Sequence, residues 1–212
     1  MVQGRQRLLD GVLGRIHENA GAVRRERAAP ADHRRIRETA LFALGWGIRG
    51  MLALVCAAAV TGKLRDRSAR AEFGAMLAAV GVPGALRMPA AGALLGGEVA
   101  VAGLSLVPAT ARLGAVIAFA LFGGLTLGVA HVVRSGSRTR CACFGRAKEV
   151  LGWRHVARNA ALTAAAVAAV ALPAAGPGRP ADLVAATAVA AIGAIAVVLL
   201  DDVVSILRAD RP

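Results

Sequence analysis

The sequence contains no tyrosine, and aromatic residues make up only 3% of its 212 positions. Aromatic side chains supply much of the buried area in water-soluble cores, so this scarcity argues against a core of that kind. Acidic residues are also sparse, at 13 against 26 lysines and arginines. Cysteine occurs three times, so any thiol chemistry is confined to Cys56, Cys141 and Cys143.

Small and aliphatic residues are abundant instead. Apolar residues account for 57% of the chain, and the mean hydropathy is +0.59. Small residues let membrane helices pack closely, so the composition predicts an all-α integral membrane helical bundle in a lipid bilayer. The net charge of +13 does not indicate nucleic acid. The basic residues lie between apolar runs rather than along one face, and no binding motif accompanies them.

Five apolar runs have roughly the length of ~20 residues that a spanning helix needs. They are Leu41–Gly62, Met88–Val107, Leu113–Val133, Ala157–Ala175 and Leu183–Leu200. Charged residues or Pro/Gly turns separate these runs, which predicts four core spans plus a fifth, C-terminal span. The expected parts are an Arg-rich tail (1–40, amphipathic or disordered), a membrane bundle (41–176), and a C-terminal spanning helix with a short tail (177–212). We expect a multi-pass protein of the cytoplasmic membrane.

A charged residue falls inside each of the first two runs. Arg49 interrupts the first run, and an arginine in hydrocarbon must reach polar surroundings or a partner. We therefore expect the first span to begin effectively near Arg49. Glu98 lies near the middle of the second run, where a carboxyl group should face the bundle interior. Its candidate partners are Lys63 and Arg49, and both a structural ion pair and a proton-handling role remain open. Cys56 is interpreted as a small packing residue.

The polar segment from Arg134 to Asn159 carries the other two cysteines. Cys141 and Cys143 are one residue apart, so a disulfide between them would close a small, strained ring that is easily reduced. Nearby arginines and Lys148 favour the reactive thiolate. Metal binding is the competing use, although the histidines do not have recognised zinc spacing. Unreactive, reduced thiols are the third interpretation. No cofactor is expected.

Several short motifs in this order resemble one known family. They are Gly62-Lys63-Leu64-Arg65-Asp66, a helix bearing Glu98, Cys141-Ala142-Cys143-Phe144-Gly145, Leu151-Gly152-Trp153 and Arg158-Asn159. Together they resemble the methylamine-utilisation MauE family of integral membrane proteins, which are relatives of the DoxX-like four-helix group. The resemblance covers residues 43–175. Family members usually have glycine between the cysteines, where this chain has Ala142.

The resemblance implies a role in maturing the disulfide-rich small subunit of methylamine dehydrogenase, together with a thioredoxin-like partner. The client here need not be that subunit. Cys141 and Cys143 would then exchange disulfides, while Lys63, Asp66, Glu98, Arg49 and Asn159 would be structural or proton-handling. Two other hypotheses remain: a non-catalytic membrane scaffold that docks a redox partner, and a small-solute transporter coupled through Glu98. The transporter hypothesis has little support, because the sequence shows no paired broken helices of the kind that form transporter binding sites.

Overall fold

The computed structural model describes residues 34–136, 151–174 and 180–209, with side chains in the last range described through residue 199. The chain divides into two compact units, Met1–Ala40 and Leu41–Pro212. In the first unit, the described residues 34–40 are helical, and Arg34 Nε donates to Glu38 Oε1 at 3.0 Å. The other described residues belong to the second unit.

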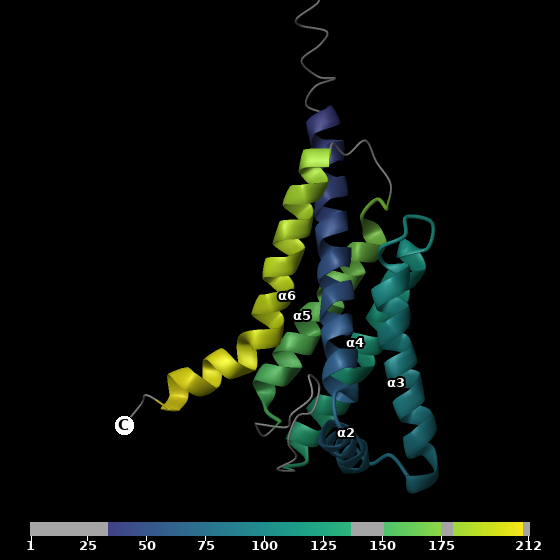
Figure 1. The fold of residues 1–212 in the computed structure, drawn as a ribbon, viewed down its shortest axis with the longest axis vertical. Helices are drawn as coiled ribbons and strands as arrows, with labels where there is room; N and C mark the ends of the chain where they lie inside the picture. The colour runs from purple at the N-terminus through teal and green to yellow at the C-terminus, as the bar shows by residue number, and fades with distance from the viewer. Residues whose placement is uncertain (1–33, 137–150, 175–179, 210–212) are drawn as a thin grey trace, which may run out of the picture. The chain divides into compact units, whose positions relative to one another are not determined.

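Every regular element in the described ranges is an α-helix, which confirms the predicted all-α class. A first helix spans Arg34–Leu64, and the others are α2 (Arg67–Ala79), α3 (Gly84–Leu104), α4 (Ala111–Arg134), α5 (Trp153–Ala171) and α6 (Pro180–Ala209). Figure 1 shows α3 and α4 running antiparallel, with α5 next to α4. The most extensive contacts among α2 to α6 are those between α4 and α5.

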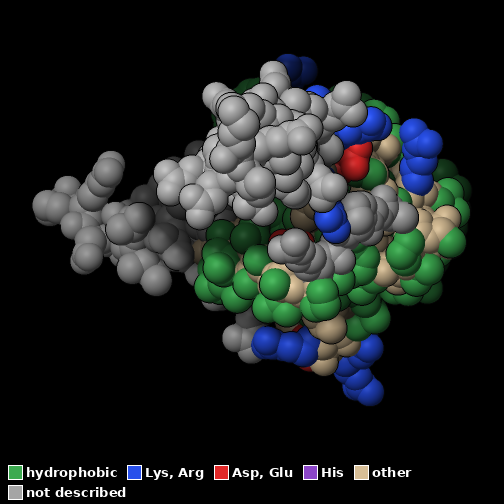
Figure 2. Space-filling model, turned by 90° about the horizontal axis from the view of Figure 1, so that it is seen from above, with side chains coloured by type: hydrophobic (Ala, Val, Ile, Leu, Met, Phe, Trp, Pro, Cys, Tyr) green, Lys and Arg blue, Asp and Glu red, His purple; other side chains and the backbone are tan. Residues whose placement is uncertain are grey.

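Four of the described helices are long and apolar enough to cross a membrane. They are Arg34–Leu64, Gly84–Leu104, Ala111–Arg134 and residues 180–199 of α6. These correspond to four of the five expected spans, and the protein is a multi-pass membrane protein. Hydrophobic side chains cover most of the described surface in Figure 2. Many of the exposed side chains on these helices are Leu, Val or Ile, as lipid contact requires.

The remaining expected span, Ala157–Ala175, is helical through Ala171 and differs from the other four. It corresponds to α5, whose first two turns contain Arg154, His155, Arg158 and Asn159. The last three of these are buried. Their polar groups lower the mean hydropathy of α5, and they face the interior of the bundle rather than lipid.

The expectation that the first span begins near Arg49 is wrong. The helix runs without interruption from Arg34 to Leu64, and Arg49 is one of its most deeply buried residues, at 2% exposure. The sequence left two ways to satisfy the guanidinium, polar surroundings at the end of the span or a partner within the protein. The structure instead satisfies it inside the protein, at the end of α5.

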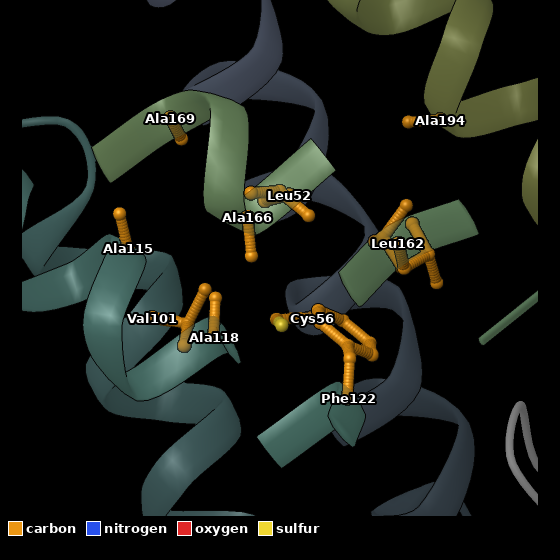
Figure 3. Close-up of a cluster of buried hydrophobic side chains, with 11 residues drawn as sticks. Leu52, Cys56, Val101, Ala115, Ala118, Phe122, Leu162, Ala166, Ala169 and Ala194 are labelled. Atoms are coloured by element: carbon orange, nitrogen blue, oxygen red, sulfur yellow. The ribbon is translucent and has the colours of Figure 1, made fainter. Parts of the chain in front are cut away.

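Small residues form most of the main core. Cys56 lies among Val101, Ala118 and Phe122, and the same cluster includes further alanines of α4, α5 and α6 (Figure 3). Small side chains at helix contacts allow the backbones to approach. Because Cys56 is 1% exposed and packs in this cluster, its interpretation as a packing residue is confirmed.

Gly114, in the first turn of α4, lies very close to Ser105, the residue that follows α3. A Cβ atom built on Gly114 would lie 2.8 Å from both the backbone nitrogen and the Oγ of Ser105. We expect Gly114→Ala to lower the free energy of unfolding by roughly 1–3 kcal/mol, because the helix end must shift to admit the methyl group. The measurement is unfolding of the purified chain in mixed detergent–SDS micelles.

Gly96→Ala is the matched control for Gly114→Ala. Gly96 lies in the neighbouring helix, and a Cβ atom built on it would meet no heavy atom within 4 Å. Alanine is the better helix former by about 1 kcal/mol, so this variant should be neutral or slightly stabilised. Equal stability of the two alanine variants would contradict the close approach at Ser105.

Candidate functional site

A buried ion pair connects the first helix to α3. Lys63 Nζ, one residue before the first helix ends, donates to Glu98 Oε1 of α3, and both side chains are 4% exposed. Of the two partners considered for Glu98, the structure therefore selects Lys63. A lone carboxylate or ammonium group in hydrocarbon is costly, and the pairing removes much of that cost only as long as both groups are present.

The helix α2 covers the Lys63 side of this pair. Asp66 is the N-cap of α2, and its Oδ1 accepts from the backbone nitrogen of Ala69 at 2.8 Å. This cap turns the chain directly after Lys63 and brings the buried Phe73 ring to 5.2 Å from Lys63 Nζ. The carboxylate of Asp66, one of the predicted site residues, therefore fixes the start of α2, and the aromatic ring of α2 covers the ammonium group.

A cavity of about 20 Å³ adjoins the ion pair. Its walls include Lys63, Glu98, Cys56, Phe73 and Asn159. Among the described residues, neither Glu98 Oε2 nor Asn159 Nδ2 has a hydrogen-bond partner, although both atoms are fully buried. A cavity needs about 10–15 Å³ to admit one water molecule, and the water needs polar partners. A volume of this size, with an acceptor and a donor beside it, can hold one water-sized polar group.

The polar contribution from α5 was only partly anticipated. Asn159 was predicted as a site residue and lies at the cavity, 3% exposed. Arg158 also lines the cavity at 5% exposure, but it was not selected from the sequence. The signal was present, because a charged residue within an apolar helix has to be buried with partners. Phe73 gave no comparable signal, since a single aromatic residue in a short helix is usually a core residue.

Arg49 lies outside this cluster and belongs to a different contact. Its Nη2 donates to the carbonyl oxygens of Ala169 and Leu172, both at 2.6 Å, and its Nη1 donates to that of Pro173 at 2.8 Å. These carbonyls belong to the last turn of α5 and the residues after it, where intrahelical donors are missing. Arg49 therefore caps the C-terminus of α5, which a cation also favours electrostatically.

The two cysteines predicted as catalytic, Cys141 and Cys143, lie outside the described residues. The ends of the segment that contains them are described. At its start, the guanidinium of Arg134 lies 5.9 Å from the centre of the Trp153 ring, which joins the end of α4 to the start of α5. At its end, the buried Leu151 packs against Val129 and Val132 of α4.

Comparison with known proteins identifies the family of this chain. Residues 41–174 match the family model described as methylamine utilisation protein MauE, which is more than half of the chain. This chain belongs to the MauE family. The matched residues contain Lys63, Glu98 and Asn159, as well as Cys141 and Cys143, and the resemblance inferred from the sequence motifs is confirmed.

One curated relative supports the MauE assignment. The methylamine utilization protein MauE of Paracoccus versutus is 48% identical to this chain over 62 residues, which is 28% of this chain and 33% of that protein. The chain thus spans about a third of the length of this curated relative. No solved structure matches the chain.

Proposed function

We propose that this MauE protein is an accessory protein of methylamine utilisation in the cytoplasmic membrane. In this role it supports the maturation of a disulfide-containing client subunit by thiol–disulfide exchange. The observation that carries the proposal is the family match over residues 41–174, which includes Cys141 and Cys143. The name of the Paracoccus relative refers to methylamine utilization. The partner in the exchange is a thioredoxin-like redox protein.

The chemistry rests on the spacing and the surroundings of the two cysteines in the sequence. One residue separates Cys141 from Cys143, and Arg140, Arg146 and Lys148 lie within a few positions of them. A strained disulfide at this spacing accepts attack readily, and nearby positive charge favours the thiolate. In the exchange, a partner thiolate attacks one sulfur, a mixed disulfide forms, and the other cysteine leaves as a thiolate. The partner's second thiolate then attacks the partner sulfur of the mixed disulfide, so that the partner leaves as a disulfide and Cys141 and Cys143 remain as a dithiol. The pair is reoxidised in the opposite direction: one cysteine thiolate attacks a partner disulfide, and the other cysteine resolves the mixed disulfide and closes the Cys141–Cys143 bond.

In this proposal, the rest of the bundle holds the cysteine segment in place. The contacts of Arg134 with Trp153 and of Leu151 with α4 hold both ends of the cysteine segment against the same pair of helices. The ion pair of Lys63 and Glu98 and the cap formed by Arg49 stabilise the bundle from inside. In this proposal, Lys63, Asp66, Glu98, Arg49 and Asn159 are positioning residues and do not take part in the exchange.

The proposal predicts that single cysteine variants trap the partner. In Cys141→Ser or Cys143→Ser, the remaining thiolate attacks the partner's disulfide, and no second cysteine is left to resolve the product. We expect a dithiothreitol-sensitive adduct on non-reducing gels of cells that express either variant. Cys56→Ser should behave like the wild type, because Cys56 is 1% exposed and belongs to the core.

The double variant separates exchange from docking. If Cys141→Ser/Cys143→Ser still matures the client and neither single variant gives an adduct, the protein is a scaffold that docks the redox partner, and the exchange mechanism is wrong. Loss of client maturation in the double variant, with an adduct in at least one single variant, supports the exchange.

A further inference from the structure

A second cavity, of about 370 Å³, lies between α2, α3 and α4. Its volume falls within the range of about 300–1,000 Å³ that is typical of small-molecule sites. All the described residues that line it are apolar, and they come from α2 and the turn after it, from α3, from α4, and from Leu151. Small-molecule sites usually carry a few polar groups that fix the orientation of the ligand. The described lining residues of this cavity provide no such polar group. The lining is therefore suited to a plain hydrocarbon chain.

The cavity exists because the facing surfaces of α3 and α4 carry very small residues. Ala90 and Ala93 of α3 face Ala120, Gly124 and Gly128 of α4 across it. A Cβ atom on Gly124 would have no heavy atom within 4 Å, and one on Gly128 would meet Val80 Cγ1 only at 3.6 Å. Larger side chains at these positions would fill the space. Since both helices are long and apolar enough to cross a membrane, hydrocarbon from the bilayer is the material available to occupy it.

A cationic group lies at the end of the cavity that is nearest the start of α3. Arg87, in the first turn of α3, shares a helix face with Ala90 and Leu94, which lie three and seven residues further on and line the cavity. The Arg87 side chain is exposed, and its Nε donates to the backbone oxygen of Val82, another lining residue, at 3.1 Å. An exposed guanidinium at a helix end is suited to bind a phosphate group.

We propose that this cavity binds one acyl chain of an anionic phospholipid, whose phosphate is held by Arg87. The length of the site runs along α3 from the helix end, where Arg87 lies, to the level of Leu94, so that head and chain follow the direction of a bilayer lipid. Leu151 forms part of the wall and is also the first described residue after the cysteine segment. The bound lipid therefore packs against the residue at which that segment joins the bundle. The site does not depend on the thiol chemistry proposed above.

Native mass spectrometry of the full-length chain in detergent micelles tests the site. The probes are dioleoyl phosphatidylglycerol, the zwitterionic dioleoyl phosphatidylcholine, and dioctanoyl phosphatidylglycerol with shortened chains. We expect one phosphatidylglycerol to bind with about fivefold preference over phosphatidylcholine, and the short-chain lipid to bind at least roughly tenfold more weakly than its long-chain counterpart, because less of the cavity is filled.

Two variants separate the chain site from the phosphate site. Gly124→Leu fills the cavity and should abolish the single high-affinity binding event for both long-chain lipids. Its control is Gly96→Leu, which adds the same side chain at another exposed glycine with no neighbour within 4 Å and outside the cavity. Arg87→Gln should keep the binding event but remove the preference for phosphatidylglycerol. Its control is Arg112→Gln, an exposed arginine at the start of α4.

Each remaining outcome overturns a definite part of the proposal. Unchanged binding in Gly124→Leu means that the acyl chain does not enter the cavity. An unchanged preference in Arg87→Gln means that the phosphate lies elsewhere. A long-chain isoprenoid alcohol is the competing ligand. If it displaces phosphatidylglycerol at concentrations where phosphatidylcholine does not, the cavity binds an isoprenoid chain and the proposed phospholipid is wrong. Arg87→Gln changes an exposed side chain, so its result remains interpretable even if Gly124→Leu fails to fold.

Discussion

Replacing Glu98 by glutamine is expected to lower the free energy of unfolding by about 3–5 kcal/mol, the range for breaking a buried ion pair by removing one partner. The glutamine has nearly the same shape, so the loss arises from the Lys63 ammonium group, which stays buried without a counter-charge. Lys63→Met should cost a similar amount, because it leaves the Glu98 carboxylate alone. Unfolding in mixed detergent–SDS micelles measures both variants.

The double variant Lys63→Met/Glu98→Gln decides whether the effect comes from the pair. Its loss should be several kcal/mol smaller than the sum of the two single losses, since neither charge is then left alone. A coupling energy below about 0.5 kcal/mol would contradict the buried pair. Glu38→Gln is the matched control. It breaks a pair with Arg34 whose side chains are 82% and 51% exposed, and exposed pairs contribute at most about 1 kcal/mol.

Arg49→Met is expected to produce the second large loss, about 3 kcal/mol, because three backbone carbonyls at the end of α5 lose their charged donor. Arg49→Lys should recover only part of this loss. A single ammonium group cannot reproduce the geometry in which two guanidinium nitrogens bind the oxygens of Ala169, Leu172 and Pro173. Amide hydrogen exchange should become faster in the last turn of α5 in both variants.

The control for Arg49 is Arg112→Met, which removes an arginine that is exposed at the start of α4. Its effect should lie within about 0.5 kcal/mol of zero. If Arg49→Met were no less stable than Arg112→Met, or if exchange increased uniformly over all helices rather than at the end of α5, the capping role of Arg49 would be refuted.

The polar residues within apolar helices show how far sequence reasoning reaches. The position of Glu98 in an apolar run was enough to predict that its carboxyl group faces inward, because the alternative is a charge in lipid. The same rule could have identified Arg158. It could not decide between Lys63 and Arg49 as the partner of Glu98, because both lie on the same helix and the choice depends on how that helix packs against α3 and α5.

The contacts of Arg49 could not be predicted from the sequence. Sequence reasoning allowed it to leave the membrane or to find a charged partner, and the structure gives it three carbonyl oxygens instead. Those acceptors are backbone atoms at residues 120 or more positions further along the chain. No side chain at those positions marks them as partners, so the contact becomes visible only when the helices have been placed beside one another.

The sequence by itself determined the class of the molecule, the position of most helices and the family, because hydrophobic runs, turn residues and short motifs are local properties of the chain. It also separated Cys56, which lies in an apolar run, from Cys141 and Cys143, which lie in a polar, basic segment. Tertiary structure alone decided the pairing of Lys63 with Glu98, the cap that Arg49 forms on α5, and the two cavities. Each of these depends on the distance between atoms of different helices, and that distance is set by the small side chains at the helix contacts, which look alike in the sequence whether they close a gap or leave one open.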